Sequence, residues 1–302
     1  MSDSLITLEG KKIILNRTYT SVATLNEPVQ FKVGIDSSTI NVSDTNLTNA
    51  VPIDDGTTCD DGSNQLTGSG AGSNSTDNTS VFKEGGGNSD VTAQNLIKDN
   101  SAVKAIWTIA NLAAAGANAV STQYVGCWLY IKDATALAKF KTSSTCFEIK
   151  IGSAVGDYYS KTYETGDLVV GWNWITSNTD LLSAWTETGT VAGNIDTFIL
   201  EITTNNATDT FVAGDLVYDL LRQWEASDLV KDFEAVPTID DTSLTSKYRC
   251  VLLTTEANGF LIDSHGTFND DSSIKLYGED TMTEESKSST DQFTYIVVDT
   301  LE

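Results

Sequence analysis

The sequence predicts an all-β protein in which a β-sandwich is inserted into a smaller, discontinuous β-rich domain. Between residues 122 and 224, short runs of β-branched and aromatic residues are cut off by Gly, Asn, Asp or Ser, as is typical of strands in a sandwich or barrel. Five of the six tryptophans lie in this block. Strand-like runs recur on both sides of it, beyond loop-like joints.

Composition limits the partners of the chain. There are 42 acidic residues against 18 basic ones, which gives a formal net charge of −24. A field of this sign repels phosphates, so nucleic acids and anionic membranes are poor partners. No apolar run approaches the ~18 residues of a membrane-spanning helix. The first residues lack the basic and apolar regions of a Sec-type signal.

The first 53 residues predict short β elements. The alternation at 29–33 is typical of a half-buried strand. Further apolar stretches occur at 5–8 and 13–15, although residues 8–19 also fit a short helix, and this alternative stays open. Residues 34–52 are polar enough for a structured loop.

Residues 54–80 predict a flexible linker. Gly, Ser, Asn, Thr and Asp dominate this stretch, and Leu66 is its only large aliphatic residue. Its acidic pairs lack the alternating carboxylates of a calcium-binding loop, so a solvated linker is favoured.

Residues 81–227 predict the sandwich itself. The Ala-rich stretch 103–119 also fits a helix, but its surroundings favour a strand at 105–109 and then a loop. Asp133 is expected to cap a short helix over 133–140. Further strands are expected at 124–132, 146–152, 168–174, 197–202 and 216–219.

The C-terminal segment returns to strands after a loop-like passage at 228–243. They are expected at 248–253, 259–263, 274–277 and 293–298, with a turn at Ser264-His265-Gly266 and the last two strands paired. Residues 1–53 and 228–302 are each too small to bury much apolar surface alone. Because the ends of a domain often lie close together, we expect them to form one discontinuous β-rich domain carrying residues 81–227 as an insertion. Three domains in series is the alternative.

Signals for catalysis are few. His265 is the single histidine and no G-x-S-x-G elbow accompanies it, which disfavours Ser-His-Asp and catalytic zinc chemistry. Phosphate-binding glycine motifs are also missing. A glycosidase needs only two carboxylates, and Glu148 and Glu201 lie within expected strands. Ordinary solvent-facing positions are favoured for both, so we expect a non-enzymatic protein.

Aromatic residues beside Asn, Asp and Gln indicate glycan binding. Ring faces stack on the C–H face of a sugar, while amides bind its hydroxyls. Trp172 and Trp174 lie two apart on an expected strand and so share a face, which is either core or surface. The candidates are Tyr158, Tyr159, Tyr163, Trp172, Asn173, Trp174 and Trp185.

Two buried polar features allow more than one interpretation. Asp219 lies in the apolar run 216–221, where a lone carboxylate needs a partner. A structural Ca²⁺ shared with the neighbourhood of Glu84 is one solution, and strand-end exposure or backbone hydrogen bonds are another. Cys127 and Cys146 form either a disulfide or two buried thiols, and in a reducing cytoplasm the thiols are favoured.

Several motifs carry a resemblance to known domains. They are Val81-Phe82-Lys83-Glu84-Gly85, Cys127-Trp128-Leu129-Tyr130-Ile131-Lys132-Asp133, Asp157-Tyr158-Tyr159, Gly171-Trp172-Asn173-Trp174 and Asp215-Leu216-Val217-Tyr218-Asp219. With them the block resembles jelly-roll, concanavalin-like or carbohydrate-binding-module-like domains of tailed-phage virion proteins. The flanks, with Phe31-Lys32-Val33-Gly34 and residues 259–268, are similar to attachment domains of phage collar and tail-fibre proteins.

The resemblance implies a structural protein of the virion, assembled in the host cytoplasm. The split domain would dock on other virion proteins at a collar, tail fibre, baseplate or capsid. The jelly roll would project and bind host-surface glycan, and a homotrimer is the usual form of such appendages. In modules of this shape an acid near the last strand often helps to hold calcium, which Asp219 and Glu84 match. The alternatives are an adhesion protein of the cell surface or a filament in a saline-habitat organism, and a glycan-degrading enzyme.

Overall fold

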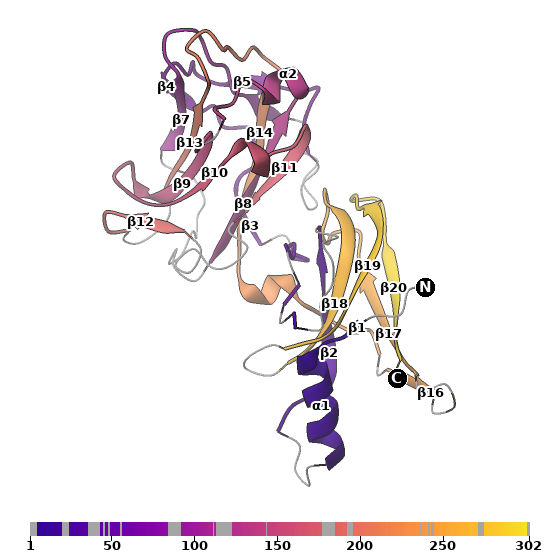
Figure 1. Ribbon diagram of the computed structural model, residues 1–302. Coiled ribbons are helices and arrows are strands. Elements are labelled where there is room, and N and C mark those ends of the chain that lie inside the picture. The colour runs from indigo at the N-terminus through magenta and orange to yellow at the C-terminus, as the bar shows by residue number, and fades with distance from the viewer. Residues whose placement is uncertain are drawn as a thin grey trace. The chain divides into compact units, whose positions relative to one another are not determined.

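The computed structural model of the chain describes residues 5–300, apart from 20–23, 36–42, 45, 48, 55, 84–91, 111, 113–122, 143, 177–184, 192–195, 236, 241, 243–244 and 271–274. The chain divides into two compact units. Unit 1 comprises Met1–Asp55 and Ser227–Glu302, and unit 2 comprises Gly56–Ala226. Antiparallel sheets dominate both units (Figure 1), so the predicted all-β class is confirmed.

Unit 2 is a sandwich of two antiparallel sheets. The first has the order β12-β10-β9-β13-β7-β4, with β12 at Thr186–Thr188, β10 at Asp157–Tyr163, β9 at Phe147–Ala154, β13 at Thr197–Thr203, β7 at Lys104–Ala110 and β4 at Thr67–Gly70. The second has the order β11-β8-β14-β6-β5, with β11 at Gly171–Thr176, β8 at Tyr124–Ile131, β14 at Leu216–Trp224, β6 at Ala93–Asn95 and β5 at Thr76–Asn78. A further strand, β3 (Thr57–Asp60), pairs with β14.

The core of unit 2 lies between these sheets. Successive side chains of a strand point to opposite faces, so every second residue of each strand is turned inward. From the first sheet these include Trp107, Ile149 and Phe198, and from the second Leu129 and Tyr218, all almost fully buried. Because such rings and branched chains each contribute on the order of 2 kcal/mol when buried, this core holds the two sheets together.

The prediction of a linker at 54–80 is wrong, because β3, β4 and β5 all lie in this segment. Leu66 and Ala71 are fully buried in the core. Polar contacts anchor the rest: Trp107 Nε1 donates to the Ser73 carbonyl at 3.0 Å, and the buried Ser75 hydroxyl donates to Gln94 at 2.7 Å. Composition misled here because strand pairing and buried polar contacts, rather than apolar content, hold the segment in place.

Other local predictions for unit 2 are confirmed. A strand, β7, covers 105–109. Asp133 caps α2 (Ala134–Leu137), since its carboxylate accepts the Ala136 N–H at 2.8 Å. A short 3₁₀ helix, η2 (Thr165–Asp167), follows β10.

All four cysteines are buried thiols, so the disulfide alternative for Cys127 and Cys146 is wrong.

Unit 1 contains two smaller antiparallel sheets (Figure 1). The five-stranded sheet has the order β1-β19-β18-β2-β15, with β1 at Leu5–Ile6, β19 at Leu276–Ser286, β18 at Leu261–Asn269, β2 at Pro28–Gly34 and β15 at Lys231–Asp232. The three-stranded sheet has the order β16-β17-β20, with β16 at Thr238–Asp240, β17 at Thr245–Leu252 and β20 at Phe293–Thr300.

Both ends of the chain build the five-stranded sheet of unit 1. Residue Leu5 of β1 pairs with Glu279 of β19, and Val33 of β2 pairs with His265 of β18. Neither terminal segment therefore completes this sheet without the other. The chain leaves unit 1 after residue 55 and returns through the 3₁₀ helix η3 (Ala226–Leu229).

The structure resolves one open alternative in unit 1 and corrects two predictions. Residues 8–19 form a helix, α1 (Leu8–Tyr19), and no helix within the described ranges is long and apolar enough to cross a membrane. Residues 264–266 are not a turn, because β18 runs through them and Gly266 allows the close approach of Leu276 and Phe268. The last two strands do not pair with each other: β19 pairs with β18 and β1, whereas β20 pairs with β17.

Candidate functional site

The outward face of the second sheet of unit 2 carries a concentration of aromatic side chains. On β8, Val125, Cys127 and Leu129 point into the core. The alternation of a strand therefore turns Trp128 and Tyr130 to the other face. The register places Trp172 of β11 opposite Tyr130, Trp174 of β11 opposite Trp128, and Trp224 of β14 opposite Tyr124 of β8.

These side chains form one continuous row, which we call the aromatic row. Neighbouring ring centroids are 6.1 Å apart for Tyr124 and Trp224, 5.8 Å for Trp224 and Trp174, and 4.9 Å for Trp174 and Trp128. The row continues at 6.3 Å from Trp128 to Trp172 and 5.2 Å from Trp172 to Tyr130. Such spacings are those of favourable aromatic pairs. The members are Tyr124, Trp224, Trp174, Trp128, Trp172 and Tyr130.

The row is only partly open to solvent. Trp224 and Trp128 are nearly buried, at 2% and 5% exposure. The other four rings are half-buried and so present part of their surface. Gly126 makes the packing possible: a Cβ at this position would lie 2.4 Å from Trp174 Cζ2, so only glycine lets this indole lie across β8.

A lysine lies against the same row. Lys83 Nζ is 4.3 Å from the Trp128 ring centroid and 5.9 Å from that of Trp172, within the range of a cation–π contact. Its backbone N–H donates to Asp219 Oδ2 at 2.6 Å. Burial lowers the pKa of the Lys83 ammonium to about 8, against the opposing effect of Asp219. Part of its charge is therefore lost in mildly alkaline solution.

The surroundings of Asp219 bear on the predicted calcium site. Its side chain is buried and carries a backbone hydrogen bond, which is one of the two predicted solutions. The nearby Lys83 ammonium is an unfavourable neighbour for a cation, and Ca²⁺ takes six to eight oxygen ligands. Within the described ranges no group of three His, Cys, Asp or Glu residues is placed to hold a metal. Glu84 lies outside those ranges, so calcium stays a prediction.

The residues predicted to bind glycan do not form one site. Trp172 and Trp174 belong to the aromatic row, but Tyr159 and Trp185 are core residues at 4% and 6% exposure. Tyr163 packs on the core, with its hydroxyl donating to the Thr176 carbonyl at 3.3 Å. Tyr158 lies on the first sheet, where its ring centroid is 5.1 Å from Lys150 Nζ.

Asn173 has a structural role instead of the predicted role in sugar binding. It is buried, and its amide donates to the carbonyls of Leu129, Val169 and Gly171. Its side-chain oxygen accepts the Val169 N–H at 2.8 Å. The residue therefore fixes the start of β11, which positions the two tryptophans on either side of it.

Sequence reasoning missed most of the aromatic row. Trp128 and Tyr130 lie in the expected strand 124–132, where their spacing places them on one face, whereas Trp224 lies beyond the expected strand 216–219. What brings them together with Trp172 is the pairing of β8 with β11 and β14. A single sequence gives no register for strands that are far apart in the chain.

The two carboxylates considered for glycosidase chemistry do meet. Glu201 of β13 lies directly opposite Glu148 of β9. Lys150 lies between them, with Nζ 2.6 Å from Glu201 Oε1 and 3.4 Å from Glu148 Oε2, and Lys104 Nζ is 2.8 Å from Glu201 Oε2. Although burial opposes it, hydrogen bonding from these lysines lowers the pKa of Glu201 below its usual value. Glu201 is therefore held ionised, unlike a general acid.

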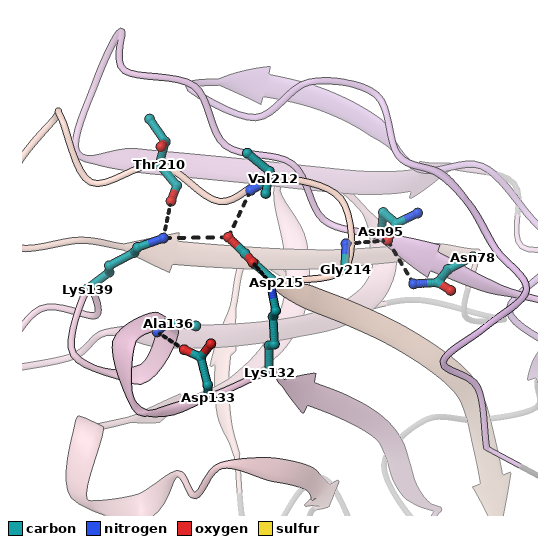
Figure 2. Close-up of polar contacts among 10 residues, drawn as sticks. All are labelled: Asn78, Asn95, Lys132, Asp133, Ala136, Lys139, Thr210, Val212, Gly214 and Asp215. Atoms are coloured by element: carbon teal, nitrogen blue, oxygen red, sulfur yellow. Dashed lines mark hydrogen bonds and ion pairs between the residues drawn. The ribbon is translucent and has the colours of Figure 1, made fainter.

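A polar network surrounds Asp215, directly before β14 (Figure 2). Asp215 Oδ1 is 3.1 Å from Lys132 Nζ and its Oδ2 is 3.5 Å from Lys139 Nζ, while the Val212 N–H donates to it at 3.2 Å. Lys139 also donates to the Thr210 carbonyl at 2.7 Å. Each charge faces an opposite charge or a carbonyl, which is the pattern of a structural brace for the loop before β14.

No known protein family matches the chain, and a search of curated proteins finds no match either.

Proposed function

We propose that this chain is a non-enzymatic structural protein that binds glycan through the aromatic row of unit 2. The observation that carries the proposal is the row itself. Six aromatic side chains from three strands line one outward face, and four of them keep part of their surface in contact with solvent. Half-exposed indole and phenol rings on a rigid sheet are suited to stacking on the apolar faces of sugars.

Charge narrows the class of glycan. The net charge of −24 disfavours uronates and sulfated sugars, because an anionic polymer meets a repulsive field on approach. Within the site, the Lys83 ammonium lies near Asp219, so the local charges offset each other. We therefore propose neutral polysaccharides as the ligand class.

Binding is tested by titrating the chain with a neutral β-glucan, a mannan and a galactan, with alginate as the acidic control, while following tryptophan fluorescence. At least one neutral polysaccharide should bind, and Trp172→Ala should weaken its binding about tenfold or more, because truncating a central aromatic residue of a binding site typically costs ~2 kcal/mol. Tyr158→Ala is the matched control, since Tyr158 lies on the first sheet.

Folding is checked by thermal melting, and Tyr130→Ala serves as a second variant of the aromatic row. If Trp172→Ala and Tyr130→Ala both fold and both bind like the wild type, the row is not the glycan site. Binding of alginate alone would contradict the assignment of a neutral ligand.

We further propose that the chain belongs to the virion of a tailed phage, attached through unit 1 to other virion proteins as a homotrimer. The resemblance of its motifs supports this context, and the division into a split unit and an inserted sandwich suits a protein that docks with one part and recognises with the other. Immunogold labelling of purified particles tests it: label at the collar, tail or capsid is expected. Label confined to a cell surface or filament would favour the adhesion alternative.

Glycan cleavage is a second candidate because Glu148 and Glu201 face each other across neighbouring strands. Because Glu201 is held ionised, Glu148 would have to be the general acid of a retaining or inverting mechanism. New reducing ends after incubation with a bound polysaccharide, lost on Glu148→Gln, would replace the binding proposal by an enzymatic one.

A further inference from the structure

Unit 1 contains a groove of about 740 Å³ that the glycan proposal does not use. It opens between strands of its two sheets, on the side where β15 and β16 lie. The lining residues are Arg17, Glu27, Pro28, Val29, Gln30, Asp232, Phe233, Ala235, Pro237, Ile239, Ser246, Tyr248 and Asp270.

The floor of this groove is apolar. The Phe233 ring lies between those of Phe31 and Tyr248, with centroid distances of 6.4 Å and 4.9 Å. Ile239 of β16 is 77% exposed, more than any other large hydrophobic residue in the described part of the chain. An exposed branched side chain beside an aromatic floor gains free energy when a partner removes it from water.

The groove is bounded by a terminal strand. β16 is the last strand of the three-stranded sheet and pairs only with β17, counting pairings among the described residues. The five-stranded sheet is not open in the same way, because just after β15 the Glu234 N–H donates to the Arg249 carbonyl of β17 at 3.1 Å. The edge strand of a sheet presents backbone groups that an extended peptide can pair with. A strand-like segment therefore fits this place better than a helix or a small molecule.

The rim carries an excess of negative charge. Glu27 is paired with Arg17, at 2.5 Å between Oε2 and the guanidinium. Asp232 and Asp270 accept hydrogen bonds from the neutral amides of Gln30 and Asn26, and neither makes an ion pair within the described part of the chain. A cationic side chain of a partner would meet two uncompensated carboxylates here.

We propose that this groove binds an extended segment of a partner protein that has apolar side chains at alternate positions and a Lys or Arg between them. The apolar side chains rest on Phe233 and Ile239, and the cation faces Asp232 or Asp270. This assigns a docking position to unit 1 and goes beyond glycan recognition by unit 2.

The proposal is tested by selecting nine-residue peptides from a random display library on the full chain and measuring the enriched peptides as synthetic, fluorescently labelled probes. Enriched sequences should alternate apolar residues and contain Lys or Arg. Ile239→Asp should weaken their binding at least tenfold without affecting folding, because this side chain is already exposed. Asp232→Asn with Asp270→Asn should reduce the dependence of binding on salt.

Ile296→Asp is the matched control, since Ile296 is 57% exposed on β20 and does not line the groove. Trp172→Ala should bind the peptides normally, which separates failure of this proposal from failure of the glycan proposal. The proposal is overturned if no peptide is enriched, or if enriched peptides bind Ile239→Asp as tightly as the wild type. It is also overturned if sedimentation shows a dimer that Ile239→Asp dissociates, because the occupant is then a second copy.

Discussion

Two buried lysines, Lys98 and Lys287, hold loops of this protein by donating hydrogen bonds to neutral oxygens. Lys98 is 1% exposed, and its ammonium donates to the carbonyls of Asp99, Ala207 and Asp209 at 2.7–3.1 Å. Lys287, also 1% exposed, donates to Asn258 Oδ1 at 2.8 Å and to the Ser288 carbonyl at 2.9 Å. In each case the buried ammonium of one lysine accounts for several oxygens of the surrounding loops.

Removing the Lys98 ammonium should therefore destabilise unit 2. Lys98→Met keeps the length of the side chain but leaves three carbonyls without this donor, and a buried unsatisfied acceptor costs ~1–3 kcal/mol. We expect the free energy of unfolding to fall by about 2 kcal/mol or more in urea denaturation. Lys141→Met, at an exposed position, should change it little. Equal stability of the two variants would show that the three carbonyls form hydrogen bonds with water when the ammonium is removed.

The charge of Lys83 should be visible in the tryptophan emission. Because burial lowers the pKa of its ammonium to about 8, the cation–π contact with Trp128 is present below that pH and lost above it. Tryptophan fluorescence should therefore change with a midpoint near pH 8, and Lys83→Gln should remove the transition.

Lys32 supplies the control for this titration. Burial lowers its pKa to about 8 as well, but its ammonium lies 4.5 Å from the centroid of Phe268, which does not emit in the tryptophan band. Lys32→Gln should leave the transition in place. If the transition survives in Lys83→Gln and disappears in Lys32→Gln, it arises from Lys32, and the assignment to Lys83 is contradicted.

At the scale of single strands, Gly126 sets the geometry of the aromatic row. The methyl group of Gly126→Ala would lie 2.4 Å from Trp174 Cζ2, so the indole has to move. We expect a loss of about 1–3 kcal/mol in the free energy of unfolding, as in other overpacked sites, together with weaker glycan binding. Gly166→Ala is the control, because nothing lies within 4 Å of its added carbon. Both variants are compared by denaturation and by glycan titration.

The strands that the sequence predicted well are short runs rich in β-branched and aromatic residues. β8, β9 and β13 are such runs. β4 and β5 could not be recognised in this way, since their residues are Thr, Gly, Ser, Asp and Asn. Polar contacts such as that of Ser75 with Gln94 stabilise this region, and they depend on residues distant in the chain.

Pairing was harder to predict than strand position. β19 and β20 are neighbours in sequence, but they belong to different sheets. The difficulty of predicting pairing also explains why the candidate site was predicted only in part. That Trp172 and Trp174 share a face follows from their spacing in the sequence, whereas the contacts of Trp174 with Trp128 and Trp224 depend on pairing between strands distant in the chain. Burial of Tyr159 and Trp185 likewise depends on which side of the sheet meets the core.

At the scale of the whole molecule, unit 2 should fold by itself. In the described part of the chain, its core cluster runs from Cys59 to Leu221, within Gly56–Ala226. We expect a fragment of residues 56–226 to melt cooperatively and to show near-ultraviolet circular dichroism from its packed tryptophans. A fragment of residues 227–302 should not, because β18 and β19 then lack β2 and β1. An unstructured 56–226 fragment would contradict this division of the chain.

The two ends of unit 2 meet, since Thr57 of β3 pairs with Gln223 of β14. When the first and last residues of an inserted unit lie side by side, the domain that carries it needs no other change to accept a different insert. Recombination at these two positions can therefore replace unit 2 by another compact unit whose ends are also adjacent. Wholesale replacement can then change unit 2 while the sequence of unit 1 is inherited unchanged.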